Sequence, residues 1–202
     1  MVYIVGIGPG ARDYMLLKAI DTLEKSKVIL GFKRALESID FIKTKKKQVN
    51  SIKEVLTYLN ENPKEDIAVV ASGDPLYYGI TSYIKENYKG EIKVVPGLSS
   101  FQFMMSKIQL PWNKSFTGSM HGREEDFIGK VKSHDISIWL TDKKNSPKEL
   151  LNKLISEDMN YKVYVGENLS YEDEKITSGF ARDLKSMEFS DLSVVVIEKC
   201  VL

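Results

Sequence analysis

Short runs of β-branched and aliphatic residues alternate with longer amphipathic stretches through the first half of the chain. This alternation is typical of an α/β domain in which helices join parallel strands. The helical stretches are recognised by apolar residues that recur every three or four positions, as Met15, Ala19 and Leu23 do. Strands are predicted at residues 2–5, 28–30, 67–71 and 92–95, and helices at residues 14–26, 33–41, 52–59, 77–87 and 99–108.

The pattern becomes less regular after Leu110-Pro111-Trp112-Asn113, where a proline and a polar turn interrupt it. We therefore expect an N-terminal domain at residues 1–112 and a C-terminal domain at residues 113–202. Strands that follow one another without helices favour a mixed sheet in the second domain, so the whole chain is predicted to be an α/β protein with one parallel and one mixed sheet. The elements expected there are strands at residues 115–119, 136–140, 162–166 and 192–198, helices beginning at residues 124 and 146, and a hairpin-like segment at residues 166–176.

Composition and charge narrow the classes of protein. With 43% hydrophobic and 28% charged residues, the composition is typical of a globular protein. A formal net charge of +1 lacks the excess of positive charge on which non-specific binding of nucleic acids depends. The single cysteine, Cys200, excludes a disulfide framework and is interpreted as a small buried residue near the end of a strand. The sequence shows neither a signal peptide nor a membrane-spanning segment, so we expect a cytoplasmic protein. The lysine-rich residues 43–47 are interpreted as a solvated loop.

Three glycine-centred turns directly follow predicted strands. They are GIGPG (residues 6–10), SGDPLYYG (residues 72–79) and PGLSS (residues 96–100). Since an open parallel sheet binds ligands at the carboxyl ends of its strands, we expect these turns to meet at one edge and to hold a small molecule largely by main chain. Asp74 is the sharpest candidate there, for a cationic or hydroxyl-rich ligand, although a lone Asp-Pro turn is usually structural.

The first turn taken alone matches the dinucleotide-binding fingerprint G-x-G-x-x-G/A, and Arg34 could then read a 2′-phosphate. Two observations argue against a nicotinamide or flavin site. Pro9 removes one of the backbone donors that a pyrophosphate needs. No acidic residue closes the second strand, because Gly31 and Phe32 stand there.

Four motifs together resemble the tetrapyrrole (corrin and porphyrin) methylases, in order and spacing and over essentially the whole chain. They are GIGPG, SGDPLYYG, VPGLSSFQ and SMHGRE. The HGR segment, with LPW before it, looks most like the cobalamin-pathway precorrin methyltransferases that act at C5. The resemblance implies two α/β domains with S-adenosylmethionine in the cleft between them, usually in a homodimer. It also implies that the C15-methylating, decarboxylating activity belongs to a separate polypeptide.

Mapped onto this sequence, the resemblance implies one set of cofactor contacts and one set of substrate contacts. The cofactor contacts would be Pro9, Gly73, Asp74, Tyr77, Ser100, Phe101, Leu140 and Leu169. A cobalt-precorrin substrate carries many carboxylates, and Arg123, Arg34 and His121 are the candidates to bind it; for His121 the alternative is a loop histidine bonded to nearby backbone.

Methyl transfer from a sulfonium needs positioning more than acid–base chemistry, so we expect no metal site and identify no general base. Two alternatives stay open. One is another methylase of the same superfamily, acting on a different tetrapyrrole, a diphthine precursor or RNA. The other is a nicotinamide-binding protein.

Overall fold

The computed structural model describes residues 1–190 and 192–199, and the chain divides into two compact units, unit 1 (Met1–Ser100) and unit 2 (Phe101–Leu202). The division falls earlier than the expected junction at residues 110–113, because helix α5 (Ser100–Ile108) packs with unit 2. Its Met104 sulfur lies against Gly166, and Lys107 pairs with Glu174 at 2.8 Å. Cys200 lies outside the described residues, so its expected burial stays a prediction.

Unit 1 is built on a five-stranded sheet in which every neighbouring pair of strands is parallel, as predicted. Its strands are β1 (Val2–Gly6), β2 (Val28–Gly31), β3 (Lys46–Gln48), β4 (Ile67–Ala71) and β5 (Ile92–Val95), in the order β3-β2-β4-β1-β5. Its helices are η1 (Arg12–Tyr14), α1 (Leu17–Lys25), α2 (Lys33–Glu37), α3 (Ile52–Glu61) and α4 (Thr81–Asn87).

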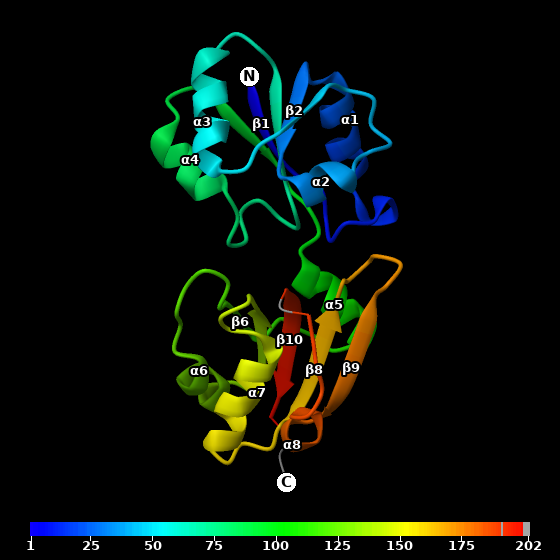
Figure 1. The fold of residues 1–202 in the computed structure, drawn as a ribbon, viewed down its shortest axis with the longest axis vertical. Helices are drawn as coiled ribbons and strands as arrows, with labels where there is room; N and C mark the ends of the chain where they lie inside the picture. The colour runs from blue at the N-terminus through cyan, green and yellow to red at the C-terminus, as the bar shows by residue number, and fades with distance from the viewer. Residues whose placement is uncertain (191, 200–202) are drawn as a thin grey trace. The chain divides into compact units, whose positions relative to one another are not determined.

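Helices cover both faces of this sheet, with α1 and α2 on one side and α3 and α4 on the other (Figure 1). Successive residues of a strand point to opposite faces, so each strand feeds two cores. Val5 and Val70 pack in the core that contains Leu23 of α1 and Leu36 of α2. Ile4 and Val69 pack in the core that contains Leu59 of α3 and Ile84 of α4. This explains why the strands read as continuous apolar runs.

Four predictions for unit 1 were wrong in detail. Helix α2 ends at Glu37 rather than at residue 41. The lysine-rich segment is not a loop throughout, since Lys46–Gln48 forms the edge strand β3. Helix α1 begins at Leu17 rather than at residue 14, after the short helix η1. Helix α4 begins at Thr81 rather than at residue 77, because Tyr78 has a positive φ of 53° and Thr81 Oγ1 donates to Pro75 O at 2.7 Å, which closes a separate turn first.

Unit 2 contains a second five-stranded sheet, in the order β6-β7-β10-β8-β9, which is mixed as predicted. Only the β6–β7 pair is parallel; the other pairs are antiparallel, and β8 and β9 form the expected hairpin. Its strands are β6 (Phe116–Ser119), β7 (Ile136–Leu140), β8 (Lys162–Glu167), β9 (Lys175–Phe180) and β10 (Ser193–Glu198). Its further helices are α6 (Phe127–Ser133), α7 (Pro147–Ser156) and α8 (Ala181–Leu184).

Trp139 is fully buried in the core of unit 2, together with Leu150 of α7 and Leu184 of α8. Helix α7 starts as expected, with Ser146 as N-cap and Pro147 in the first turn. Helix α6 starts at Phe127 and not at residue 124, because Asp126 is its N-cap and accepts a hydrogen bond from Gly129 N at 3.0 Å. Among the described residues no helix is long and apolar enough to cross a membrane.

Candidate functional site

The three glycine turns of unit 1 meet at one edge of its sheet, as the sequence predicts. Strand β1 lies between β4 and β5, so the carboxyl ends at Gly6, Ala71 and Val95 are neighbours. The first two turns are hydrogen-bonded directly: Gly73 N donates to Gly8 O at 2.7 Å and Gly8 N donates to Gly73 O at 3.4 Å. The third turn approaches them so closely that a Cβ on Gly97 would lie 2.2 Å from Gly73 O.

Gly73 gives this edge an accessible stretch of backbone. Its φ of +68° lies in the left-handed region, which glycine adopts without cost. A Cβ placed there would be in ordinary van der Waals contact with Ser99 Cα at 3.7 Å and Ser100 N at 3.9 Å, so the third turn packs against this residue without a clash. Gly73 itself is half-buried and carries no side chain, so a ligand can reach its main chain from the exposed side.

Asp74 ties the second turn to the third. Its Oδ1 accepts a hydrogen bond from Leu76 N at 2.7 Å, and its Oδ2 accepts one from Gly97 N at 3.2 Å. The side chain is half-buried. The alternative of a structural Asp-Pro turn therefore has direct support, and a contact with a ligand stays a prediction for the same carboxylate.

The other cofactor candidates of unit 1 lie around this edge. Pro9 is half-buried in the first turn, Tyr77 is half-buried with its ring 4.8 Å from that of Tyr78, and Ser100 opens helix α5 directly after the third turn. The first turn does not lead straight into a helix, because η1 intervenes before α1 begins at Leu17. This is a further departure from the dinucleotide fingerprint, whose turn opens a helix.

The candidates of unit 2 also gather at one sheet edge. Strands β6, β7 and β8 run in the same direction, since β10 is antiparallel to both β7 and β8. Their carboxyl ends therefore carry the loop with His121 and Arg123, the end of β7 at Leu140, and the turn with Leu169, which is buried. Phe101 lies on α5, where it is buried with its ring 5.3 Å from that of Trp112.

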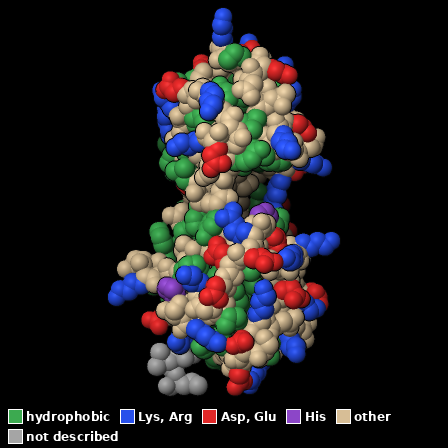
Figure 2. Space-filling view, turned by 90° about the vertical axis from the view of Figure 1, so that its left-hand side faces the viewer, with side chains coloured by type: hydrophobic (Ala, Val, Ile, Leu, Met, Phe, Trp, Pro, Cys, Tyr) green, Lys and Arg blue, Asp and Glu red, His purple; other side chains and the backbone are tan. Residues whose placement is uncertain are grey.

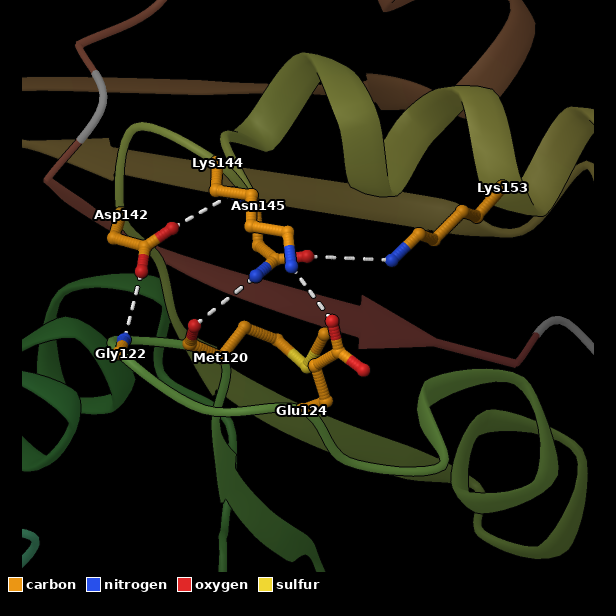
Figure 3. A network of polar contacts seen from close by, with 7 residues as sticks. All are labelled: Met120, Gly122, Glu124, Asp142, Lys144, Asn145 and Lys153. Carbon is orange, nitrogen blue, oxygen red and sulfur yellow. Dashed lines mark hydrogen bonds and ion pairs between the residues drawn. The ribbon is translucent and has the colours of Figure 1, made fainter.

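The loop between β6 and α6, here the HGR loop (residues 120–126), is held by the loop after β7 (Figure 3). Gly122 N donates to Asp142 Oδ2 at 2.7 Å, and Asn145 Nδ2 donates to Met120 O at 3.3 Å. His121 Nδ1 lies 3.3 Å from Thr141 O, which is the backbone contact considered for it above.

Electrostatics support the same arrangement. The N–H groups of Gly122 and Asn145, which point at the Asp142 carboxylate, hold its pKa below the usual value for aspartate. Lys144 pairs with Glu124 at 2.6 Å, and Ser119 N donates to Glu125 Oε1 at 3.3 Å. These two glutamates are therefore tied to the loop and its neighbour rather than to the start of α6.

Sequence reasoning missed Asp142 and Asn145. Their spacing was a usable signal, because an aspartate can accept the backbone N–H of a residue shortly after it in a turn, and Asn145 N donates to Asp142 Oδ1 at 2.7 Å. Arg34 lies exposed on α2 of unit 1, and Arg123 lies exposed in the HGR loop. Among the described residues, no three His, Cys, Asp or Glu side chains lie where they could share a metal ion.

Comparison with known proteins identifies the family. The model of the tetrapyrrole (corrin/porphyrin) methylases matches residues 1–185. A probable cobalt-precorrin-7 C(5)-methyltransferase from Methanocaldococcus jannaschii is 35% identical over 98% of both chains. The cobalt-precorrin-7 C(5)-methyltransferase of Salmonella typhimurium is 28% identical over 87% of this chain and 89% of its own.

Solved structures agree with this assignment. The precorrin-6Y methylase of Archaeoglobus fulgidus superposes with a TM-score of 0.80 at 26% identity, covering 100% of this chain and 99% of its own. Uroporphyrin-III C-methyltransferase from Thermus thermophilus, in complex with S-adenosylhomocysteine, shares the fold with a TM-score of 0.81 at 18% identity over 98% of this chain and 91% of its own. The chain thus belongs to the tetrapyrrole (corrin/porphyrin) methylases, as its four glycine-containing motifs indicate.

Proposed function

We propose that this protein is an S-adenosylmethionine-dependent C-methyltransferase of cobalamin biosynthesis that methylates C5 of cobalt-precorrin-7. The observation that carries the proposal is the 35% identity to the Methanocaldococcus relative, whose aligned region extends over 98% of both chains. The family assignment supports the class of reaction, and the HGR segment supports the choice of a corrin precursor.

The glycine edge of unit 1 fits an adenosyl cofactor. Gly73 is half-buried with main chain that carries no side chain, and Asp74 and Tyr77 follow it in the same turn. We assign the cofactor contacts to Pro9, Gly73, Asp74, Tyr77 and Ser100 in unit 1, and to Phe101, Leu140 and Leu169 in unit 2. S-adenosylmethionine supplies a methyl group already activated by its positive sulfur.

The protein's part in the reaction is to place the acceptor carbon in line with that methyl group. Orientation of this kind accounts for several kcal/mol of a barrier. We assign the carboxylates of the macrocycle to Arg123 and Arg34, with His121 beside Arg123. Guanidinium groups suit this task because they donate paired hydrogen bonds to carboxylates. A cobalt ion would arrive inside the substrate.

A homodimer in the cytoplasm, which works beside a separate C15-methyltransferase and decarboxylase, belongs to the same proposal. The family resemblance supports the dimer. The aromatic residues Phe101 and Phe103 add no support, because they are 6% and 1% exposed and so are buried within unit 2. Light scattering at micromolar concentration should report twice the 23.0 kDa mass of one chain; a strictly monomeric result would remove the dimer from the proposal.

A direct assay tests the reaction. The enzyme is supplied with C5-unmethylated cobalt-precorrin-7 and S-adenosylmethionine carrying a ¹³C-methyl group, and NMR locates the label. Calorimetry in parallel should show stoichiometric binding of S-adenosylmethionine and none of NAD or NADP. Label at C5 supports the proposal. Binding of a nicotinamide cofactor, or transfer to elongation factor or RNA in place of any corrinoid, would overturn it.

A second substrate within the family is the main alternative. Uroporphyrinogen-III C-methyltransferase of Methanobacterium ivanovii is 28% identical over 98% of this chain, so a different tetrapyrrole is the alternative with most support. An RNA substrate has less support, because basic and acidic side chains are interspersed on the face shown in Figure 2 and the net charge is +1. The same assay with uroporphyrinogen III as substrate tests the alternative of a different tetrapyrrole, which label on uroporphyrinogen III would support.

A further inference from the structure

We propose that Asp142 is a positioning residue for the substrate, which fixes the HGR loop so that Arg123 is presented to the carboxylates of the macrocycle. This inference rests on the proposed function. Asp142 is not itself assigned to the substrate, and its hydrogen bond to the HGR loop is to the backbone. It acts between His121 and Arg123, where its Oδ2 accepts from Gly122 N at 2.7 Å.

We call this contact between the Asp142 carboxylate and Gly122 N the clamp. The HGR loop depends on it because the loop has no regular secondary structure of its own between β6 and α6. His121, Gly122 and Arg123 are all exposed, so burial of apolar surface does not fix them. Gly122 has a φ of +67°, one of several conformations that glycine adopts without strain, so a contact is needed to select it. The bond from its N–H to a carboxylate is charge-assisted and therefore stronger than an ordinary backbone bond.

The residues that hold Asp142 are themselves well fixed. Its second oxygen accepts Asn145 N at 2.7 Å, and Asn145 is a buried residue that also donates to Met120 O at 3.3 Å. Thr141, just before it, is buried at 2% exposure and exchanges hydrogen bonds with Ser193 of β10 at 2.9 and 3.0 Å. The clamp is thus anchored to the core of the sheet and reaches outward to the HGR loop.

The position of the clamp in the chain links it to the proposed chemistry. Leu140, a proposed cofactor contact, ends strand β7 and is followed directly by Thr141 and Asp142. Met120 N also donates to Leu140 O at 2.8 Å. Asp142 therefore sets where the HGR loop stands relative to the end of β7, within one rigid set of contacts in unit 2.

The test is Asp142→Asn, which keeps the size of the side chain and removes its charge and one acceptor. We expect kcat/KM for cobalt-precorrin-7 to fall by ~10- to 100-fold, since a hydrogen bond to a charged group is lost, with most of the fall in KM. The Kd for S-adenosylmethionine should change by less than about twofold, since a tenfold loss would mean 1.4 kcal/mol of lost cofactor contact. Hydrogen exchange at residues 120–126 should become faster.

Asp158→Asn is the matched control. Asp158 is exposed, pairs with Arg182 away from the HGR loop, and has a φ of 56° that asparagine also accepts. This variant should keep wild-type kcat/KM. Wild-type kcat/KM in Asp142→Asn, or unchanged exchange in its HGR loop, would overturn the inference. If the wild type fails to methylate cobalt-precorrin-7, the proposed function falls, and the exchange measurement still decides whether Asp142 holds the loop.

A second pair of variants keeps the inference testable if Asp142→Asn does not fold. Gly122→Asn retains the N–H and tolerates a positive φ, whereas Gly122→Val does not tolerate it. A Cβ at Gly122 would meet no atom within 4 Å, so the Cβ of neither variant clashes. We expect Gly122→Val to lose cobalt-precorrin-7 turnover and Gly122→Asn to retain it. Equal activity of the two would contradict the proposed role of the loop conformation.

Discussion

Replacement of Gly97 by alanine should disrupt the edge of unit 1 at which the three turns meet. The new Cβ would lie 2.2 Å from Gly73 O, 2.9 Å from Gly6 C and 3.0 Å from Gly6 Cα. All three atoms are backbone, and the Gly8–Gly73 hydrogen bonds and the β1–β4 ladder hold them in place. No side-chain rotation can relieve the overlap, so the third turn has to move away.

The cost can be worked out from this geometry. Overpacking of a rigid site costs about 1–3 kcal/mol. Movement of the third turn also lengthens the 3.2 Å bond from Gly97 N to the Asp74 carboxylate, and a hydrogen bond to a charged group contributes about 1.5–3 kcal/mol. We therefore expect a loss of roughly 3–5 kcal/mol in the free energy of unfolding of unit 1. For a unit of 100 residues this lowers Tm by more than ~10 °C.

Gly73→Ala is the matched comparison, since it adds the same methyl group at the same edge. Its nearest new contact would be 3.7 Å away, so only the positive φ of 68° opposes it. That strain costs roughly 1–2 kcal/mol. Thermal unfolding followed by circular dichroism, with calorimetric titration of S-adenosylmethionine, measures both variants. Gly73→Ala should stay folded and bind the cofactor weakly; a wild-type Tm for Gly97→Ala, or greater damage from Gly73→Ala, would refute the reasoning.

Three further outcomes are expected. Arg123→Ala should raise KM for cobalt-precorrin-7 at unchanged cofactor affinity, with a loss of ~1.5–3 kcal/mol, and Arg123→Lys should lose less; steady-state kinetics with equal losses in both variants would contradict a role for the charge. Asp74→Ala should weaken binding of S-adenosylmethionine and also lower Tm, because the Leu76 and Gly97 amides lose their acceptor; unchanged affinity with a lower Tm would leave Asp74 purely structural. The lowered pKa of Asp142 means that its contribution to stability is complete above the ordinary aspartate pKa of 3.8 and is lost as pH falls through the lower folded-state value. The gap in Tm between wild type and Asp142→Asn should therefore be constant from pH 7 to about pH 4 and shrink below it; a gap that does not change with pH would show that the carboxylate charge is not involved.

The sequence predicts those parts of the fold that depend on runs of apolar residues. Strands β1, β4 and β5 were placed correctly because buried parallel strands are continuous β-branched runs, and the turns after them were found because glycine and proline mark them. Strand β3 was missed because its three residues, Lys46 to Gln48, are polar and lie at a sheet edge, where lysine is common.

The parts of the candidate site that lie in a distinctive sequence motif were predictable. Contacts between residues of different loops were not. The meeting of the three turns was predicted because each follows a strand of one parallel sheet, whereas the strand order that makes them neighbours comes from the structure. The clamp of Asp142 on Gly122 joins residues 20 positions apart in the chain through a carboxylate–amide bond. Periodicity carries no signal for such a contact, because it depends on the parallel pairing of β6 with β7.

The central place of β1 in its sheet has a consequence for the order in which the chain folds. Both neighbours of β1 come later in the sequence: β4 ends at Ala71 and β5 at Val95. During synthesis β1 therefore has no neighbouring strand until more than 60 further residues have left the ribosome. Its apolar side chains and both of its hydrogen-bonding edges stay uncovered until then. Unit 1 then closes around it as a contiguous piece of chain, before most of unit 2 has been made. Chains interrupted before β4 should consequently aggregate or require a chaperone, whereas a chain that ends just after Ser100 retains every strand of its sheet.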